Sequence, residues 1–79
     1  MLGELLKNAR NAAKMTQEDL AFKAGVDRAY ISQLEHDKKS PTVQMLFRLC
    51  HAMEASPGQI IRTLEERGVE RKQKPNGDN

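Results

Sequence analysis

The sequence is poor in several residue types, and each shortage excludes a class of protein. A single cysteine excludes an intramolecular disulfide and a zinc site built from cysteines. No apolar run near the N-terminus is long enough for a secretory signal or a membrane span, so we expect a cytoplasmic protein with no membrane partner. The 79 residues have room for one domain, in which a deep catalytic cleft is hard to accommodate.

Aromatic residues and alternating patterns are also scarce, which argues against β-structure. The chain has three aromatic residues, Phe22, Tyr30 and Phe47, and no strict alternation of apolar and polar positions. Its apolar residues recur instead at helical spacing almost throughout. Hydrophobic residues make up 38% of the chain, which is enough for a small core. We therefore predict an all-α fold, a compact bundle of five helices.

The first three helices are predicted from apolar periodicity and from residues that favour helix ends. The first covers about residues 2–13, and its apolar face consists of Leu2, Leu5, Leu6, Ala9 and Ala13. The second begins at Thr16, whose hydroxyl can accept from the Asp19 N–H, and it ends at Gly25, since glycine tolerates a left-handed cap. The third follows Asp27 as N-cap and ends near residues 35–36, with Ile31 and Leu34 buried.

The last two helices are predicted from residues that favour a helix start. The fourth starts at Thr42, just after Pro41, and its expected inward residues are Val43, Leu46, Leu49, Cys50 and Met53. The fifth has Ser56 as cap, Pro57 as its first residue, Gln59 in a capping-box position and Gly68 at its end, where Val69 can touch Leu64. We assign residues 1–69 to one domain and residues 70–79 to a disordered polar tail.

The segment from Gln17 to Leu34 carries the most information about function. Two short helices are joined there by a turn of about four residues beginning at Gly25, with the small Ala21 where helices that cross steeply must touch. Once Ile31 and Leu34 anchor the second helix, its other face offers Arg28, Ala29, Ser32 and Gln33. Such side chains suit the base edges in a DNA major groove, because they offer hydrogen bonds and no bulky hydrophobic group.

The same segment resembles a known family. From Met15 to Ile61 the chain is similar to the helix-turn-helix family of phage repressors and Cro proteins, called XRE, through the "TQEDLA" start, the "ISQLE" end and the positions of Pro41, Ser56 and Ile60. The stretch "VDRAYIS" is especially similar to restriction–modification controller proteins. The resemblance implies a five-helix fold, sequence-specific operator binding and homodimerisation.

The resemblance also implies roles for individual residues. Those expected to face base pairs are Arg28, Ala29, Ser32 and Gln33, and those expected at the DNA backbone are Gln17, Tyr30, Lys38, Lys39 and Ser40. Arg10 and Glu35 match a structural ion pair between the first and third helices. Three positions where the family often has glycine hold Lys14, Asp37 and Glu54 instead, so we expect turns of slightly different shape.

A dimer surface is expected at the C-terminal end of the domain. Leu46, Leu49, Met53 and Ile60 should fill the core of one copy. Phe47, Ile61 and Leu64 are then surplus, and an exposed apolar cluster on a small domain usually marks a contact. We therefore expect a homodimer through the fifth helix and the end of the fourth. The expected partner is double-stranded DNA with a palindromic site, whose half-sites lie about 34 Å apart.

Electrostatic attraction to DNA depends on where the basic residues lie, because the net charge is small. The net charge is +2, and residues 1–66 carry nine basic and nine acidic side chains. Attraction must therefore come from basic residues gathered on one side, namely Lys7, Arg10, Lys14, Arg28, Lys38 and Lys39.

Other functional classes remain open or are disfavoured. An antitoxin-like or partner-binding module on the same fold is the main alternative, and a structural bundle without DNA affinity is another. Ser32, His36 and His51 form no nucleophile–base arrangement, and the two histidines lack metal-ligand spacing. We accordingly expect no enzyme activity, no metal, no cofactor and no small-molecule ligand.

Overall fold

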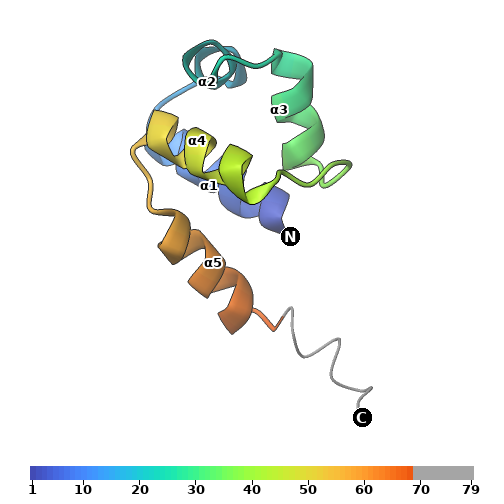
Figure 1. The fold of residues 1–79 in the computed structure, drawn as a ribbon, viewed down its shortest axis with the longest axis vertical. Coiled ribbons are helices and arrows are strands. Elements are labelled where there is room, and N and C mark those ends of the chain that lie inside the picture. The colour runs from blue at the N-terminus through green and yellow to red at the C-terminus, as the bar shows by residue number, and fades with distance from the viewer. Residues whose placement is uncertain (69–79) are drawn as a thin grey trace.

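The computed structural model describes residues 1–68. Within that range the chain forms five α-helices and no strand: α1 (Leu2–Ala12), α2 (Gln17–Ala24), α3 (Arg28–Glu35), α4 (Val43–Met53) and α5 (Pro57–Glu66) (Figure 1). The all-α, five-helix prediction is confirmed. Among these helices, none is long and apolar enough to cross a membrane. The predicted tail and the predicted contact of Val69 lie outside the described residues.

The helix ends follow local rules that are legible in the sequence. Thr16 Oγ1 accepts from the Asp19 N–H at 3.0 Å, and the Asp19 carboxylate accepts from the Thr16 N–H at 2.9 Å, which completes a capping box. Gly25 ends α2 with a φ of 76°, in the left-handed region. Ser56 caps α5 by accepting from the Gln59 N–H at 3.2 Å. Asp27 precedes α3 as predicted, but its carboxylate makes no capping hydrogen bond.

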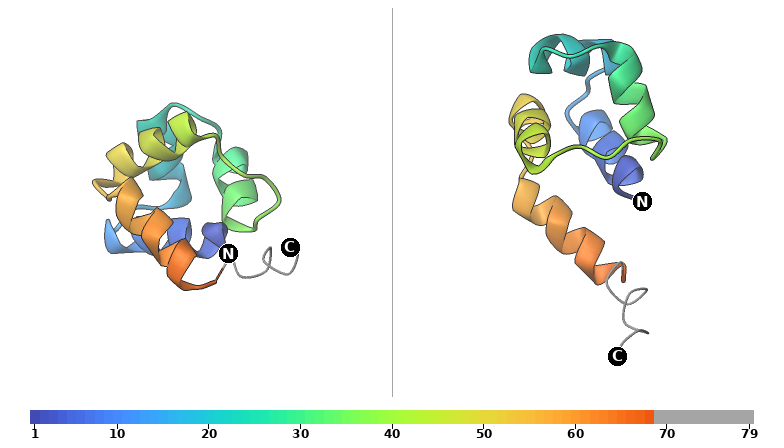
Figure 2. Two further views of the ribbon diagram at one scale, coloured as in Figure 1. Left: turned by 60° about the horizontal axis from the view of Figure 1, so that its bottom comes forward. Right: turned by 45° about the vertical axis from the view of Figure 1, so that its right-hand side comes forward.

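All five helices contribute to one core. The larger buried side chains are Leu5, Leu6, Leu20, Ile31, Leu34, Leu46, Leu49, Cys50, Met53 and Ile60. Helices α1 to α4 surround this core, whereas α5 extends away from them and buries only Ile60 (Figures 1 and 2). The predicted burial of Val43 is wrong, because its side chain is 67% exposed. Val43 lies in the first turn of α4, before the helix reaches the core at Leu46.

A close contact between α1 and α3 depends on Gly3. A Cβ atom at this position would lie 2.5 Å from the carbonyl oxygen of Leu34 and still closer to that of Glu35. The start of α1 therefore rests directly on the backbone at the end of α3. This contact fixes the end of α3 that faces away from the helix-turn-helix turn.

Three turns adopt the left-handed conformation without glycine. The φ angles are 60° at Lys14, 58° at Asp37 and 55° at Glu54. At these three positions a residue with a Cβ thus holds the left-handed conformation that favours glycine. The Asp37 carboxylate accepts from the Gly3 N–H at 2.9 Å and pairs with the Met1 amine, so it ties the loop after α3 to α1.

Candidate nucleic-acid interface

Helix α3 has one buried face and one face toward solvent. Ile31 and Leu34 are buried as predicted, each with 2% of its surface exposed. The side chains predicted to face base pairs lie on the solvent side, where Arg28 and Ala29 are exposed and Ser32 and Gln33 are half-buried. The helix stands at the edge of the molecule, with no other helix on its outer side (Figure 1).

The predicted pair of Arg10 and Glu35 is confirmed and buried. Arg10 Nε donates to Glu35 Oε2 at 2.7 Å and Arg10 Nη2 donates to Glu35 Oε1 at 3.0 Å, so the contact is bidentate. Arg10 Nη1 also donates to the carbonyl oxygen of Met15 at 2.8 Å. The pair joins α1, the following turn and α3.

The protonation of this pair follows from its hydrogen bonds. The hydrogen bond to Glu35 raises the pKa of Arg10. Burial raises the pKa of Glu35, but hydrogen bonds from Arg10 and Gln17 together with the positive charges of Arg10 and Lys7 outweigh burial, and the resulting pKa lies below its usual value. Both groups are therefore charged near neutral pH. Arg10 is buried and paired, so its positive charge is offset by Glu35 within the fold.

A chain of hydrogen bonds leads from this buried pair to the exposed start of α3. Gln17 Nε2 donates to Glu35 Oε1 at 3.0 Å, and Arg28 Nη1 donates to Gln17 Oε1 at 3.3 Å. The amide of Gln17 thus connects a buried carboxylate to a predicted base-contacting side chain. Sequence reasoning placed Gln17 at a DNA phosphate and did not foresee this link, which restricts the Arg28 side chain before any ligand binds.

A shallow hollow runs beside α3. Its volume is about 440 Å³, and it is lined by Val26, Asp27, Ala29, Tyr30, Gln33, Lys39 and Met45. The hollow brings together four residues that were predicted to contact DNA, three from α3 and one from the following loop. Arg28 and Ser32 do not line it. The polar side chains of Arg28 and Ser32 therefore lie on α3 beside this partly apolar hollow.

The loop after α3 is fixed to the end of that helix. The backbone N–H groups of Lys38 and Lys39 both donate to the carbonyl oxygen of Gln33, at 2.8 and 3.3 Å. The side chains of Lys38, Lys39 and Ser40 are exposed. Three of the residues predicted at the DNA backbone are thus presented close to the end of α3.

His36 directly follows α3, is exposed, and lies against Ser32 on the outer side of that helix. Its Nδ1 lies 2.8 Å from the carbonyl oxygen of Ser32 and 3.5 Å from the Ser32 hydroxyl. The spacing of Ala29, Ser32 and His36 is helical, so His36 continues the outward stripe of α3 past Glu35.

Two short helices around a left-handed glycine turn, the second with a polar outer face, define a helix-turn-helix domain. The family described as Helix-turn-helix matches residues 6–60. The chain therefore belongs to the XRE-type helix-turn-helix family.

Curated relatives and solved structures agree with this assignment. An uncharacterized HTH-type transcriptional regulator, y4dJ of Sinorhizobium fredii, is 27% identical over 84% of this chain and 86% of its own length. The immunity repressor protein of Bacillus phage phi105 is 30% identical over 76% of this chain, which spans 42% of that repressor.

Two solved structures have the same fold. The clp gene regulator ClgR from C. glutamicum has a TM-score of 0.78 and 29% identity, covering 84% of this chain and 86% of its own. The wild-type restriction-modification controller protein C.Esp1396I has a TM-score of 0.73 and 32% identity, covering 82% of this chain and 86% of its own. Fold and family are those of DNA-binding transcriptional regulators, which are not enzymes.

Proposed function

We propose that this protein is a sequence-specific, cytoplasmic transcriptional regulator that binds a palindromic operator as a homodimer, with α3 in the major groove. The observation that carries the proposal is the outer face of α3, where four small or polar side chains lie on the solvent side of the helix. An α-helix fits the width of the major groove, and each base pair presents a distinct pattern of donors and acceptors there.

Each of the outward residues is chemically suited to a different contact with a base pair. Arg28 can donate two hydrogen bonds to guanine, and its link to Gln17 already restricts where it points. Gln33 suits adenine, Ala29 can contact a thymine methyl group, and Ser32 can meet either a donor or an acceptor.

The residues around this face suit the sugar–phosphate backbone. Lys38, Lys39 and Ser40 follow α3 in an anchored loop, Tyr30 lines the same hollow as Lys39, and Gln17 lies against Glu35 and Arg28 of α3. Contacts of this kind set the position of a protein on DNA without reading its sequence.

The proposed dimer surface lies on α4 and α5. Phe47 is 54% exposed and Ile61 is 47% exposed, while Leu64 packs partly against the core. Because α5 buries only Ile60 within its own copy, a second copy can cover the rest of its apolar stripe. A two-fold dimer of this kind would present two α3 helices to one side of a duplex.

Selection of bound DNA from a random pool tests the proposal. We expect enrichment of a palindrome whose half-site centres lie about one helical turn apart. A gel shift with DNA from upstream of its own gene separates this function from a partner-binding role. No enrichment of any sequence would contradict the proposal.

A further inference from the structure

Three carboxylates lie on α3 or in the segments directly beside it, and two of them have partners. Glu35 pairs with Arg10, and Asp37 pairs with the Met1 amine. The third is Asp27, which directly precedes α3. Its side chain is exposed and forms no ion pair with any of residues 1–68. Asp27 therefore places an uncompensated negative charge at the start of α3.

Helix capping does not account for this aspartate. Three other helices are capped by N-cap side chains that accept from a backbone N–H, namely Thr16, Thr42 and Ser56. Aspartate is among the best residues for this role, yet the Asp27 carboxylate makes no capping hydrogen bond. The neighbouring Arg28 donates to Gln17 and not to Asp27. The acceptor oxygens of Asp27 are therefore available to a ligand.

Asp27 belongs to the surface that is proposed to face DNA bases. It lines the hollow beside α3 together with Ala29 and Gln33, two of the residues proposed to contact base pairs. Val26 and Met45 line the same hollow and are half-buried, so apolar surface accompanies the carboxylate. A hydrogen-bond acceptor and an apolar contact are thus offered within one recess.

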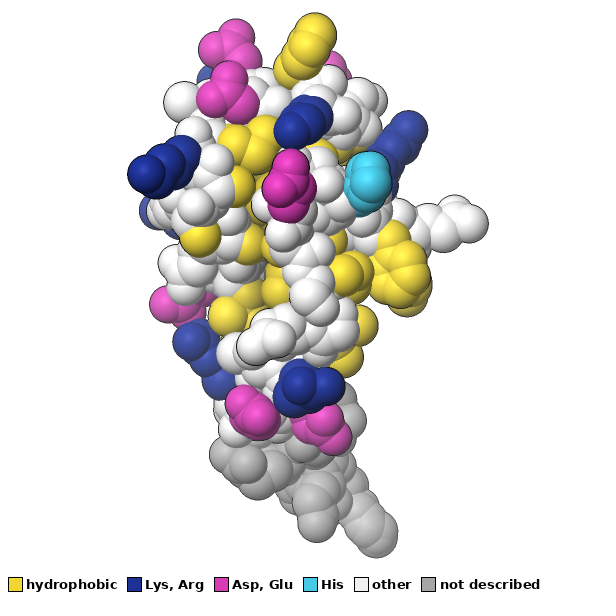
Figure 3. Space-filling model, turned by 90° about the vertical axis from the view of Figure 1, so that its left-hand side faces the viewer, with side chains coloured by type: hydrophobic (Ala, Val, Ile, Leu, Met, Phe, Trp, Pro, Cys, Tyr) yellow, Lys and Arg dark blue, Asp and Glu magenta, His cyan; other side chains and the backbone are white. Residues whose placement is uncertain are grey.

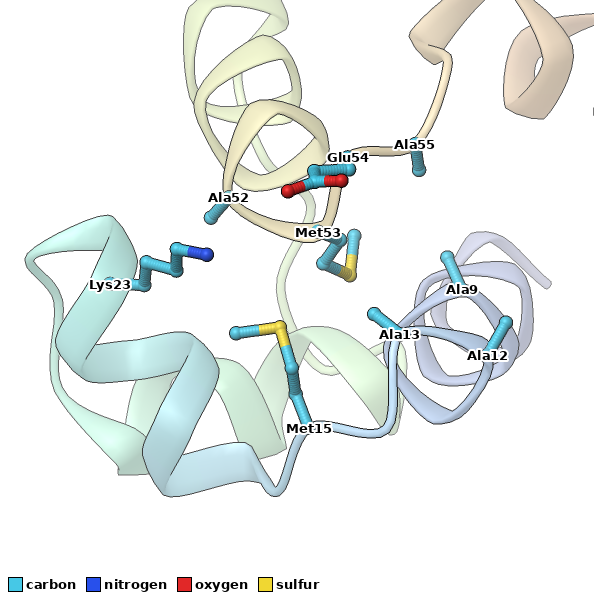
Figure 4. A pocket seen from close by; sticks show the side chains of 9 residues that line it. All are labelled: Ala9, Ala12, Ala13, Met15, Lys23, Ala52, Met53, Glu54 and Ala55. Carbon is cyan, nitrogen blue, oxygen red and sulfur yellow. The ribbon is translucent and has the colours of Figure 1, made fainter.

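A carboxylate on a DNA-facing surface opposes binding, which a carboxylate elsewhere does not. On the face opposite α3, acidic and basic side chains are interspersed (Figure 3). The groove between the ends of α1, α2 and α4 is likewise lined by both Lys23 and Glu54 (Figure 4). Neither surface is proposed to meet phosphate groups. Asp27 instead shares its hollow with Lys39, and its charge weakens the attraction of that lysine for the DNA backbone. A contact with a base that needs an acceptor would offset this loss.

We propose that Asp27 reads cytosine, by accepting a hydrogen bond from the N4 amino group of that base in the major groove. The inference rests on the proposed placement of α3 in that groove. The hydrogen-bonding groups that guanine and thymine present there are all acceptors, so both bases repel a carboxylate. Adenine presents its amino group beside the N7 acceptor. The amino group of cytosine lies beside a C–H group, which suits the apolar surface of Val26 and Met45. Asp27 thus favours one base and disfavours the other three.

Selection from a random DNA pool with the wild type and Asp27→Ala, followed by affinity measurements at fixed salt concentration, tests this inference. For the wild type we expect cytosine at one position of each half-site. Asp27→Ala should lose this preference, and its ratio of operator to random-DNA affinity should fall at least about fivefold. Its affinity for random DNA should rise, because a negative charge is removed. Since the Asp27 side chain makes no capping bond or ion pair, the variant should fold normally, as circular dichroism can verify.

Two control variants separate base reading from charge. Glu54→Gln removes a negative charge from the groove away from α3, and it should change no base preference. Asp27→Asn removes the charge at the proposed contact and keeps the shape of the side chain. Because its amide can also donate, this variant should admit guanine and thymine at the cytosine position.

Removing the amino group from the DNA tests the same contact from the other side. The base 2-pyrimidinone is cytosine without its amino group. Placed at the selected position of each half-site, it should weaken wild-type binding at least about fivefold and leave the affinity of Asp27→Ala unchanged. Any effect of the analogue on the duplex itself acts on both proteins alike.

The possible failures are distinguishable. A selected operator without a cytosine preference, or with one that survives in Asp27→Ala, would overturn this inference alone. So would an Asp27→Ala variant that binds operator and random DNA more tightly by the same factor. No enrichment of any sequence by the wild type would contradict the proposed function, and this inference with it.

Discussion

The residues in left-handed conformation are the clearest points of local strain. The left-handed conformation is less favourable by about 1–2 kcal/mol for a residue with a Cβ. Glycine adopts it more readily but loses more conformational entropy on folding. Lys14 and Glu54 make no side-chain hydrogen bond among the described residues, whereas Asp37 uses its carboxylate to hold α1. The three positions are therefore not equivalent.

Replacement of Glu54 by glycine should stabilise the fold. We expect Glu54→Gly to raise the free energy of unfolding by about 0.5–1 kcal/mol, measured by urea denaturation, because backbone strain at the end of α4 is released. Glu54→Ala is the matched control, since it removes the carboxylate and keeps the Cβ. An equal gain from both variants would show that side-chain charge, and not backbone conformation, is responsible.

At the scale of elements, the contact between α1 and α3 decides how α3 is held. Gly3→Ala places a methyl group on the carbonyl oxygens at the end of α3, so the two helices must move apart. We expect a loss of about 1–3 kcal/mol in the free energy of unfolding. Gly58→Ala is the control, because its added Cβ would meet only the Ser56 hydroxyl at 3.8 Å. Equal stability of Gly3→Ala and the wild type would contradict the close approach.

The ion pair between α1 and α3 makes stability depend on pH. The pKa of Glu35 is lowered from its usual 4.5, so its contribution is complete above pH 4.5 and is lost as the pH falls through the lowered value. We expect the free energy of unfolding, measured by urea denaturation at a series of pH values, to decrease in this acidic range. Asp19 and Asp37, whose pKa values are also lowered, act in the same direction.

A paired substitution isolates the part that belongs to Glu35. The double variant Arg10→Met, Glu35→Leu should show a shallower acid slope and keep a similar stability at neutral pH, because apolar replacements for buried ion pairs are often neutral. Arg10→Met alone should cost about 3–5 kcal/mol at neutral pH, since it leaves a buried carboxylate without its partner. An unchanged slope in the double variant would show that Glu35 is not the titrating group.

Helices and their ends were predictable because their determinants are local. Thr16 with Asp19, Gly25, and Ser56 with Pro57 each satisfy a rule that spans a few residues, and the buried Ile31 and Leu34 follow from periodicity. The family resemblance added the Arg10–Glu35 pair, which joins residues 25 positions apart.

The remaining structural features depend on how the helices pack against one another, and a local sequence pattern does not predict that packing. Gly3 is required by the backbone of α3, and Val43 is exposed because the first turn of α4 lies outside the core. The link from Glu35 through Gln17 to Arg28 forms only when side chains from α2 and α3 are brought together by the fold. The DNA-contacting roles of α3 and its loop stay predictions.

At the scale of the whole molecule, α5 is the element that most needs a second copy. It fully buries only Ile60 in its own domain, whereas Ile61 is exposed and Leu64 is partly buried. We expect Ile61→Asp, Leu64→Asp to shift sedimentation from dimer to monomer, because two carboxylates cannot be buried in a symmetric apolar contact. An Arg62→Ala variant on the polar side of α5 should remain dimeric. A fully dimeric double-aspartate variant would rule out this surface.

The most direct test of the account compares the wild type, Arg28→Ala and Lys39→Ala in one selection from a random DNA pool, with affinities measured at fixed salt concentration. We predict that Arg28→Ala costs about 1–3 kcal/mol on the selected operator and relaxes the preference at one base pair in each half-site. Lys39→Ala should weaken binding to all sequences alike. An Arg28→Ala profile identical to that of the wild type, with equal losses on operator and random DNA, would contradict base reading by α3.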